Sequence, residues 1–389
     1  MARSNTLPVA TLLVVLCALS SSSCTQNATM RSSNTDVEGG DTNARSDALP
    51  SGFEEPAELV LRQFDTKDVV FLGEPHKVQE HLRFMAQLVP ALHARGVDFL
   101  FYEFMAHEDN AAIDSLLNAP RFDRQLAGRW LAGPLYDWAF AEYVDVLEAA
   151  WQVNRTAPPD HKFHVLGINN RTYWGKDRNQ RWQERDWADV ILQATEHGKR
   201  KALVYCGTHH ALYKTTLPYF ENGVVAGHAK RDRVSHYVLD DLGPARVSTI
   251  WLHYLWPDAG FRMQHVPHGG VFDSLACAMR RPFAFDANAS PWGAHVDTGS
   301  VYAASTAGMA LKELVDGYIV LAPITDLHLC RYIPHFIAER DMALVNAQVL
   351  FFEGYTMSNA EQVNDTLDAY YSWLARQFEE RRAFAPPCR

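Results

Sequence analysis

The sequence predicts an α/β fold, with a mainly parallel sheet and helices on both of its faces. From residue 55 onward, short runs rich in Val, Ile, Leu, Phe and Tyr alternate with longer amphipathic segments. The short runs lack strict alternation of apolar and polar residues, which is typical of strands covered on both faces. Strands and helices in regular succession favour crossover connections and therefore parallel pairing.

The apolar runs are the expected strands, and three longer segments are the clearest expected helices. The strands are 68–74, 97–104, 162–169, 201–207, 235–241, 247–254 and 317–323. The helices are 81–96, 140–154 and 180–198. The first and third of these helices end at glycines, which commonly terminate helices. Helix-rich stretches at 105–150 and 325–385 predict a helical cap or small helical lobe beside the sheet.

Composition narrows the class of protein. The chain has 389 residues, of which 47% are hydrophobic and 21% charged, and this excludes a disordered chain, a collagen-like repeat and a coiled coil. The formal net charge is −10, from 36 Lys and Arg against 46 Asp and Glu. A general basic surface for nucleic acid is therefore not expected. The 17 histidines direct attention to metal or acid–base chemistry.

Residues 1–24 have the pattern of an export signal. Arg3 precedes an apolar run at 7–19, which is too short to span a bilayer but suits the core of a signal peptide. Small residues then lead to Cys24 in a pattern similar to a bacterial lipobox, although Ser21 stands where Leu is usual. We therefore expect export to the cell envelope (bacterial outer membrane or periplasm) with a lipid anchor at Cys24. The alternative is an ordinary secretory peptide, cut within the serine run, and a secreted protein.

The remaining chain divides into a tether and a folded domain. Residues 25–50 are dominated by Ser, Thr, Asn, Asp and Gly, which predicts a flexible tether. Residues 51–389 form the expected domain, with a core at about 65–325 and a C-terminal helical part at 325–385.

Four cysteines lie beyond the export signal and Cys24. They are Cys206, Cys277, Cys330 and Cys388, and their spacing is too wide for a zinc ribbon or knuckle. In an oxidising compartment they can form one or two disulfides, and the sequence leaves the pairing open. Cys206 ends an apolar run, which favours a small core residue over a disulfide partner.

Polar and ionisable residues follow four of the expected strands at their carboxyl ends. Ligand sites of open α/β sheets lie outside this edge, so we expect these side chains to converge. Gly73 and Gly207 at two of these ends allow the chain to bend and a ligand to approach the backbone. The residues are Glu74, His76, Glu103, Asn169, His209 and His210.

Two kinds of chemistry fit this set. Imidazole and carboxylate groups bind divalent metals such as Mn²⁺ or Zn²⁺, which activate water. Without a metal, two carboxylates and a histidine suffice for general acid–base hydrolysis. The expected catalytic groups are Glu74, His76, Glu103 and His210, and the expected metal ligands are these four together with His209.

Plainer interpretations of these groups stay open. His76 alone fits an ordinary surface histidine, and Glu103 fits an ion pair with Arg185 or Arg83. The adjacent histidines 209–210 point in different directions, so only one of the two is expected to face the site.

Three residues are expected to bind substrate: Arg185, Asn169 and His268. Arg185 lies beside Asp186 within an expected helix, where a solvated pair is the ordinary alternative. His268 lies in the loop 265–270, which contains a proline that prevents the helical spacing of a metal-binding histidine pair. This favours a substrate-binding loop there.

Several familiar motifs are missing from the sequence. There is no Gly-x-Ser-x-Gly elbow, so a serine hydrolase of the α/β type is unsupported. The glycine-rich motifs of dinucleotide and nucleotide binding and the His-Glu-x-x-His zinc helix are absent as well.

Two segments resemble the superfamily that joins erythromycin esterases, ChaN-like haem-binding lipoproteins and Tiki/TraB metalloproteases. The first, 72–103 (LGEPHKVQEHLRFMAQLVPALHARGVDFLFYE), is similar to the signature of strand, Gly-Glu-x-His, helix, strand and Glu. The second, 185–213, resembles the ChaN-like Arg-Asp helix followed by a strand and Gly-x-x-His. The late run 315–324 is also similar, so the resemblance covers roughly residues 65–325, with the ChaN-like branch the most similar.

The resemblance implies a site built from Glu74, His76, Glu103 and His210, with His209 and Arg185 as second choices. It implies an exported hydrolase of a small molecule or peptide, as in the esterase and Tiki branches, with or without a divalent metal. The alternative is a ChaN-like haem or iron carrier without catalysis, often paired, which adds a homodimer to the expectations. Its haem-binding tyrosine has three candidates here: Tyr102, Tyr136 and Tyr173. A protein-interaction lipoprotein with a vestigial site is the third interpretation.

Overall fold

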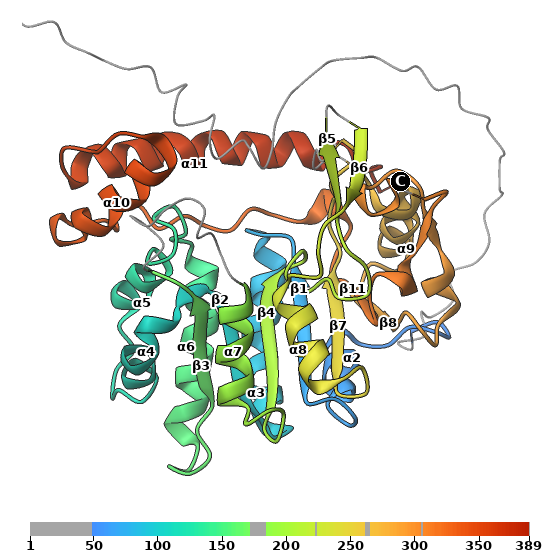
Figure 1. The fold of residues 1–389 in the computed structure, drawn as a ribbon, viewed down its shortest axis with the longest axis horizontal. Helices are drawn as coiled ribbons and strands as arrows, with labels where there is room; N and C mark the ends of the chain where they lie inside the picture. The colour runs from blue at the N-terminus through green and yellow to red at the C-terminus, as the bar shows by residue number, and fades with distance from the viewer. Residues whose placement is uncertain (1–48, 172–183, 222–223, 261–264, 305, 389) are drawn as a thin grey trace, which may run out of the picture.

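The computed structural model describes residues 49–388 apart from 172–183, 222–223, 261–264 and 305. The predicted signal peptide, and the predicted tether up to residue 48, lie outside the described residues. The described chain places one large sheet between two layers of helices (Figure 1). This is the α/β architecture that the sequence predicts.

The sheet has seven strands in the order β3-β2-β4-β1-β7-β11-β8. All neighbours pair in parallel except β8, which runs antiparallel to β11 at one edge. The prediction of a mainly parallel sheet is therefore confirmed. The strands are β1 (Val69–Glu74), β2 (Val97–Ala106), β3 (His164–Asn169), β4 (Lys201–Gly207), β7 (Val247–Leu252), β8 (Phe283–Asp286) and β11 (Gly317–Val320).

Helices cover both faces of the sheet, and alternate strand residues pack against each layer. Val70 and Leu72 of β1 join the hydrophobic cluster that contains α3 (Gln79–Ala94) and α6 (Ala141–Thr156). Val69 and Phe71 join the opposite cluster, which contains α7 (Glu184–Ala194) and α8 (Val234–Leu242). Because strand side chains alternate, continuous apolar runs serve both layers. The remaining helices of these layers are α2 (Pro56–Gln63), α4 (Asn110–Leu117), α5 (Arg124–Leu131) and α9 (Val271–Met279).

The strand predicted at 235–241 is wrong, because this segment is helix α8. Val234, Val238 and Leu242 are buried and lie four residues apart, which places them on one face of a helix. Gly243 follows with a φ of 83°, and a glycine in this left-handed half of conformational space commonly ends a helix.

Short strands outside the predicted set complete the described structure. β8 has only four residues and pairs at the sheet edge, where a run too short to show a periodicity still gains a partner. Two small antiparallel pairs were also not predicted: β5 (Pro218–Glu221) with β6 (Val224–His228), and β9 (Val296–Asp297) with β10 (Met309–Ala310).

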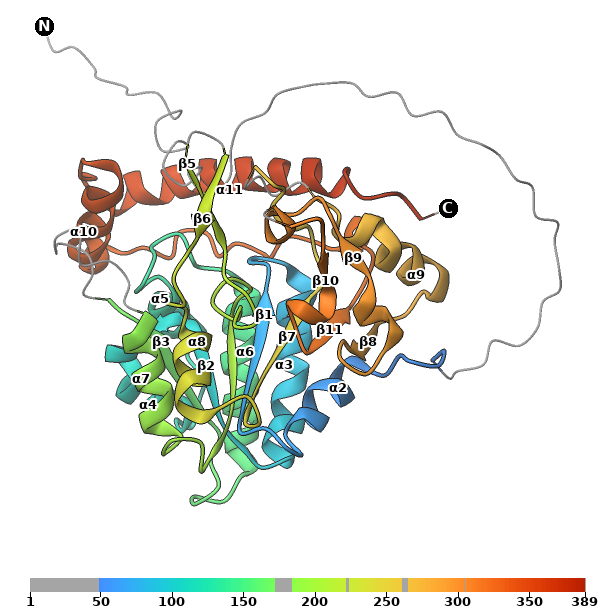
Figure 2. The same cartoon turned by 45° about the vertical axis from the view of Figure 1, so that its right-hand side comes forward.

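The C-terminal part of the chain forms a helical cap, as predicted. It consists of α10 (Met342–Glu353) and the 23-residue helix α11 (Ala360–Arg382). Figure 2 shows α11 lying across the carboxyl ends of the central strands. The ring of Phe378 stacks on Tyr254 just after β7, and the hydroxyl of Tyr370 lies 3.5 Å from the Nζ of Lys77 just after β1.

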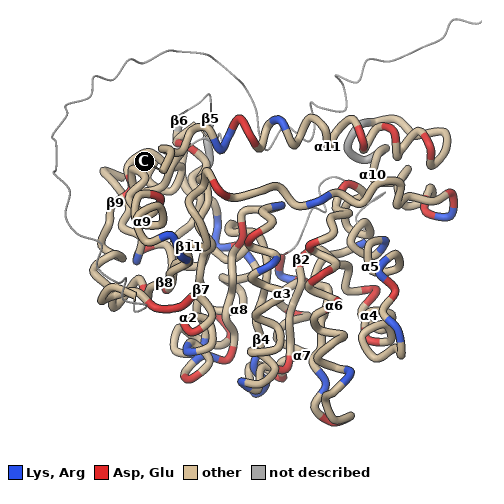
Figure 3. The backbone as a smooth tube through the Cα atoms, turned by 180° about the vertical axis from the view of Figure 1, so that it is seen from behind, with Lys and Arg blue, Asp and Glu red and all other residues tan. Residues whose placement is uncertain are grey.

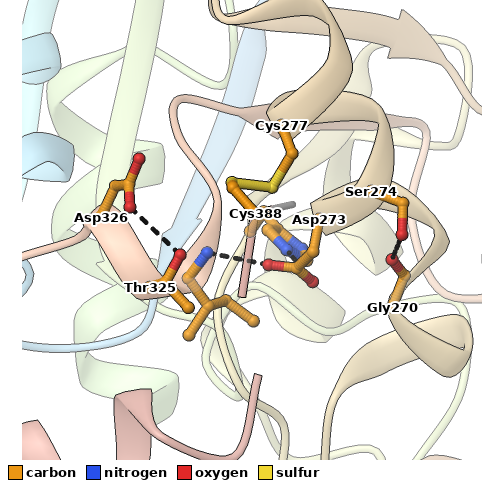
Figure 4. Close-up of a disulfide and its surroundings, with 9 residues drawn as sticks. Gly270, Asp273, Ser274, Cys277, Thr325, Asp326 and Cys388 are labelled. Carbon is orange, nitrogen blue, oxygen red and sulfur yellow. Dashed lines mark hydrogen bonds and ion pairs between the residues drawn. A yellow bond between two sulfur atoms is a disulfide. The ribbon is translucent and has the colours of Figure 1, made fainter. Parts of the chain in front are cut away.

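One disulfide ties the end of the chain to the body. Cys277 of α9 is bonded to Cys388 (Figure 4). Cys206 and Cys330 are buried free thiols. The expectation of Cys206 as a core residue is therefore confirmed. Beside the disulfide, the carboxylate of Asp273 accepts a hydrogen bond of 2.8 Å from the backbone N–H of Ile324.

Charged residues of both signs are interspersed over the outer helices (Figure 3). Arg124 of α5, for example, pairs with Asp145 and Glu148 of α6, so these contacts fasten one helix to the next. Among the described residues, no helix combines the length and the apolar character needed to cross a membrane.

Candidate functional site

The site lies at the carboxyl ends of three neighbouring strands, β2, β4 and β1. Glu74 ends β1 and pairs in register with Gly207, the last residue of β4. Glu103 lies near the end of β2, and His210 follows β4 by three residues. The parallel order therefore brings together the four residues predicted as catalytic, although the strands come from distant parts of the sequence.

Glu74 is fully buried and is bound by three donors. Its Oε1 accepts the hydroxyl of Tyr143 at 2.5 Å and lies 3.0 Å from the Nδ1 of His76. Its Oε2 accepts the hydroxyl of Tyr205 at 2.5 Å. Burial raises the pKa of Glu74, and the three donors oppose that rise because they favour the carboxylate.

The bond to Glu74 sets the role of the His76 ring. A carboxylate at Nδ1 places the proton on that nitrogen, which leaves Nε2 with its lone pair free to accept a proton. The ring packs edge-on against the stacked rings of Phe104 and Trp138, with centroid distances of 5.6 and 5.1 Å. Its side chain is 37% exposed, so the oriented imidazole can reach a ligand.

Gly207 allows this ring to lie directly over the backbone of β4. A Cβ at Gly207 would stand 2.7 Å from the Cε1 and 2.8 Å from the Nε2 of His76. It would also stand 3.5 Å from the Cδ2 of His210, so the two imidazoles flank the same point. The close approach predicted at this glycine is therefore occupied by a side chain of the site itself.

His210 lies between two carboxylates and is positively charged at neutral pH. Its Nδ1 lies 3.0 Å from Glu184 and its Nε2 lies 3.4 Å from Glu103. Burial alone would lower the pKa of His210, but Glu184 and Glu103 outweigh it and raise the pKa to about 9. Glu103 also accepts the backbone N–H of Gly207 at 2.6 Å, and Glu184 pairs with Arg233 at 2.7 Å.

Glu184 is a residue of the candidate site that sequence reasoning missed. Burial would raise its pKa, but His210 and Arg233 lower it to about 2, so Glu184 is an anion at neutral pH. The next residue, Arg185, was predicted to bind substrate, but it lies on the exposed side of α7 and pairs with Asp189 at 2.9 Å. Adjacent helical residues point about 100° apart, so one position separates the two roles.

Tyr143 and Tyr205 were missed as well. Tyr205 stands opposite Leu72 in the β1–β4 register, and Leu72 shares a face with Glu74. The proximity of Tyr205 to Glu74 can be predicted only when the pairing register of β1 and β4 is known. Without that register, Tyr205 resembles any large core residue. Tyr143 comes from α6, and nothing in its local pattern separates it from the buried apolar residues of that helix.

The other predicted residues occupy different surroundings. His209 is turned away from His210, with its Nε2 3.0 Å from the hydroxyl of Tyr302, and burial lowers its pKa to about 3. The prediction that the two adjacent histidines diverge agrees with this geometry. Asn169 ends β3, and its side-chain oxygen accepts the backbone N–H of Asn170.

His268 belongs to an aromatic cluster beyond β7. Its ring contacts Trp256 and Phe272, with centroid distances of 5.0 and 5.3 Å, and its backbone N–H donates to Asp297. Burial lowers the pKa of His268 to about 4, so the ring is neutral. Its link to the strand ends runs through Trp256, which contacts the Tyr302 ring.

The predicted divalent metal does not fit this arrangement. Within the described ranges, no group of three or more His, Cys, Asp or Glu side chains is placed to hold a metal ion. Both oxygens of Glu74 accept hydroxyl donors, and one oxygen of Glu103 accepts the N–H of Gly207. Carboxylates already satisfied by donors would have to break those bonds to coordinate a cation.

Two of the three tyrosines considered for haem binding are buried in the described structure. Tyr102 is fully buried, and its hydroxyl donates to the backbone oxygen of Tyr143 at 3.2 Å. Tyr136 is also buried, and Tyr173 lies outside the described residues.

Comparison with known proteins gives likeness at the level of the fold. No protein-family model matches the chain, and no curated protein matches it. A solved protein of Bacillus cereus is 10% identical, with a TM-score of 0.49 over 71% of this chain and 92% of that one. A succinoglycan biosynthesis protein is 11% identical, with a TM-score of 0.48 over 69% and 90%. ChaN of Campylobacter jejuni, solved with cofacial haem, is 14% identical, with a TM-score of 0.33 over 51% and 86%. These likenesses assign no activity to this chain.

Proposed function

We propose that this protein is an exported hydrolase in which the Glu74–His76 pair activates water beside the cationic His210. The observation that carries the proposal is the bond from Glu74 to the Nδ1 of His76, 3.0 Å long, with the opposite ring nitrogen directed over Gly207. A buried carboxylate that orients a partly exposed imidazole is the arrangement of a histidine general base and the carboxylate that positions it.

The first step takes a proton from water. The Nε2 of His76 accepts the proton as the water oxygen bonds to an acyl carbon, and Glu74 stabilises the imidazolium that forms. The electron pair of the carbonyl bond moves to its oxygen, giving a tetrahedral intermediate. When the intermediate collapses, the bond to the leaving group breaks and His76 returns the proton to it. The balance is one water added across one ester or amide bond.

His210 supplies the electrostatic part of the reaction. It lies beside the point that His76 also flanks, and its pKa of about 9 keeps it charged at neutral pH. A fixed cation in a partly buried site stabilises the negative oxygen of the intermediate without rearranging during the reaction. Glu103 and Glu184 hold the ring in place from opposite nitrogens.

The test is hydrolysis of a panel of p-nitrophenyl esters by the purified full chain. Because general-base catalysis contributes about 10²–10⁴-fold, Glu74→Gln and His76→Ala should each reduce turnover by factors in that range. The control is His328→Ala, since His328 pairs with Glu80 at 2.8 Å on the exposed surface and repeats the His–Glu pair away from the site. Equal activity in wild type and His76→Ala would contradict the proposal.

A haem titration on the same preparations separates the alternative suggested by the ChaN-like resemblance. The hydrolase predicts no Soret shift that depends on His76 or His210. A tight Soret-shifting complex, together with no hydrolysis that depends on His76, would favour the carrier. The absence of both hydrolysis and haem binding would favour the third interpretation, a protein-interaction lipoprotein with a vestigial site.

A further inference from the structure

The geometry points to Lys77 as the residue that positions the Glu74–His76 pair and couples it to the helical cap. Lys77 directly follows His76 in the chain and touches neither the water nor the substrate of the proposed reaction. It acts through its neighbours by two routes, one along the backbone and one through its side chain. The inference rests on the proposed function for its kinetic readout but not for its structural readout.

The backbone of Lys77 is held in an unusual conformation. Its φ is +69°, in the left-handed region that non-glycine residues rarely adopt. Both of its backbone polar groups are bonded: the N–H donates to the hydroxyl of Tyr143 at 3.1 Å, and the oxygen accepts the N–H of Cys330 at 2.8 Å. Such a conformation persists only where the surroundings fix it, and here it turns the chain immediately after His76.

The backbone route ends at Glu74. The hydroxyl of Tyr143 accepts from Lys77 and donates to the Oε1 of Glu74 at 2.5 Å. The direction of the first bond leaves the hydroxyl hydrogen free to point at the carboxylate, and bonds in such a chain strengthen one another. The same oxygen of Glu74 holds the Nδ1 of His76. The turn at Lys77 therefore sets the donor that holds the catalytic carboxylate.

The side chain route ends at the ring of His76. The Nζ of Lys77 lies 3.3 Å from Asp137 and 4.7 Å from the centre of the Trp138 ring. The Trp138 ring stacks on Phe104 at 5.2 Å and meets the His76 ring edge-on at 5.1 Å. A cation held against an aromatic face is attracted to it, so the ammonium fixes the wall against which His76 packs.

The cap reaches the same lysine. The Tyr370 hydroxyl of α11 lies 3.5 Å from the Nζ of Lys77, and the next residue, Tyr371, donates to the backbone oxygen of Asp137. Two consecutive residues of α11 thus bind the lysine and the residue paired with it. A change in the position of α11 would reach the catalytic pair through Lys77.

The experiment reads the tautomer of His76 by nitrogen NMR on the full chain, with the signal assigned by its loss in His76→Ala. Lys77→Met keeps the length of the side chain but removes the charge, and Lys77→Arg keeps the charge. Lys214→Met is the matched control, because Lys214 forms a similar half-buried pair at 2.7 Å with Asp316, which directly precedes β11.

We expect a single tautomer with the proton on Nδ1 in wild type, Lys77→Arg and Lys214→Met, and a mixture in Lys77→Met. With p-nitrophenyl acetate, Lys77→Met should lower kcat by about ten- to a hundredfold with KM nearly unchanged, because small misplacements of a catalytic group cost this much. An unchanged tautomer in Lys77→Met, or the same loss in Lys214→Met, would overturn the inference.

The inference can still be tested if one of the variants does not fold. If Lys77→Met fails to fold, Lys77→Gln retains a donor toward Asp137 without the charge and carries the same expectation. If wild type shows no hydrolysis that depends on His76, the proposed function fails. The tautomer comparison still decides the role of Lys77 in that case.

Discussion

Gly207 shows how one missing side chain shapes the site. The His76 ring occupies the space that a Cβ at this position would need, with the nearest ring carbon 2.7 Å from it. The glycine has no positive φ, so its conformation alone would accept other residues. What requires glycine here is the close approach of the imidazole, which must come this near to meet both Glu74 and the neighbourhood of His210.

Gly207→Ala should therefore separate activity from stability. The added methyl pushes the His76 ring toward solvent and breaks its bond to Glu74, so hydrolysis should fall by about a hundredfold. The free energy of unfolding, measured in urea, should fall by only about 1–2 kcal/mol, because the displaced group is the end of a side chain. Gly128→Ala in α5 is the control, since its Cβ would lie 3.6 Å from Ile333. It should keep activity and gain up to about 1 kcal/mol of stability.

His210 is charged because two carboxylates outweigh its burial. Its pKa in the folded protein, about 9, lies above the ordinary value of 6.5. A raised histidine pKa means that the folded state holds the proton more tightly than the unfolded state. The stabilisation is complete below the unfolded pKa and is lost as the pH rises through the folded pKa.

The stability of the protein should accordingly fall between pH 6.5 and pH 9, the two values that bound this transition. The part due to His210 is on the order of 1–3 kcal/mol. Urea unfolding of wild type and His210→Gln across this range measures it as the difference between the two pH dependences. Parallel curves for the two proteins would show that the charge of His210 does not stabilise the fold.

At the scale of elements, periodicity decided what could be predicted. Runs such as 68–74 and 201–207 became strands close to their predicted bounds because long apolar runs without helical spacing have few alternatives. The prediction for 235–241 was wrong because the buried apolar residues in and beside this run, Val234, Val238 and Leu242, lie four apart, and because the length of the run does not exclude a helix. β8 was not predicted because four residues are too few to show a periodicity. They form a strand only because they pair with β11 at the edge of the sheet.

The site divides in the same way. Glu74, His76, Glu103 and His210 were predictable because parallel strands end at one edge, which places the residues after them close together. Glu184 was not predictable, because it enters from a helix whose rotation about its axis depends on packing. Tyr205 reaches Glu74 because of the register of β4 against β1, and Tyr143 reaches it because of the placement of α6. Both features belong to the tertiary structure and are not visible in the local sequence.

The disulfide should stabilise the cap element most of all. It joins Cys277 of α9 to Cys388, only six residues after α11 ends at Arg382, and spans 111 residues of sequence. Closing a loop of this size restricts the unfolded chain, so Cys388→Ser should lower the free energy of unfolding by about 2–5 kcal/mol. Cys277→Ser should give the same loss, and the double variant should lose no more. Additive losses would mean that the cysteines act separately and that the bond does not form.

At the scale of the whole molecule, the cap and the sheet form one unit around the strand ends. α11 contacts the segment after β1 through Tyr370 and the segment after β7 through Phe378, and the disulfide fastens its far end. Disulfides persist in oxidising compartments, which is where the predicted export signal would take the chain. The disulfide and the predicted export signal therefore support the same proposal, that the protein is located outside the cytoplasm.

The anchor itself gives the last prediction. A lipobox cysteine carries acyl chains, and two or more chains hold a protein on a membrane where one is marginal. The full chain, expressed in a bacterium that processes lipoproteins, should sediment with membranes and incorporate labelled palmitate. Cys24→Ser should lose the label and appear in the aqueous fraction, whereas Cys17→Ser, within the predicted apolar core of the signal, should behave as wild type. An unlabelled wild-type protein released from the cell would instead identify residues before Cys24 as an ordinary secretory peptide.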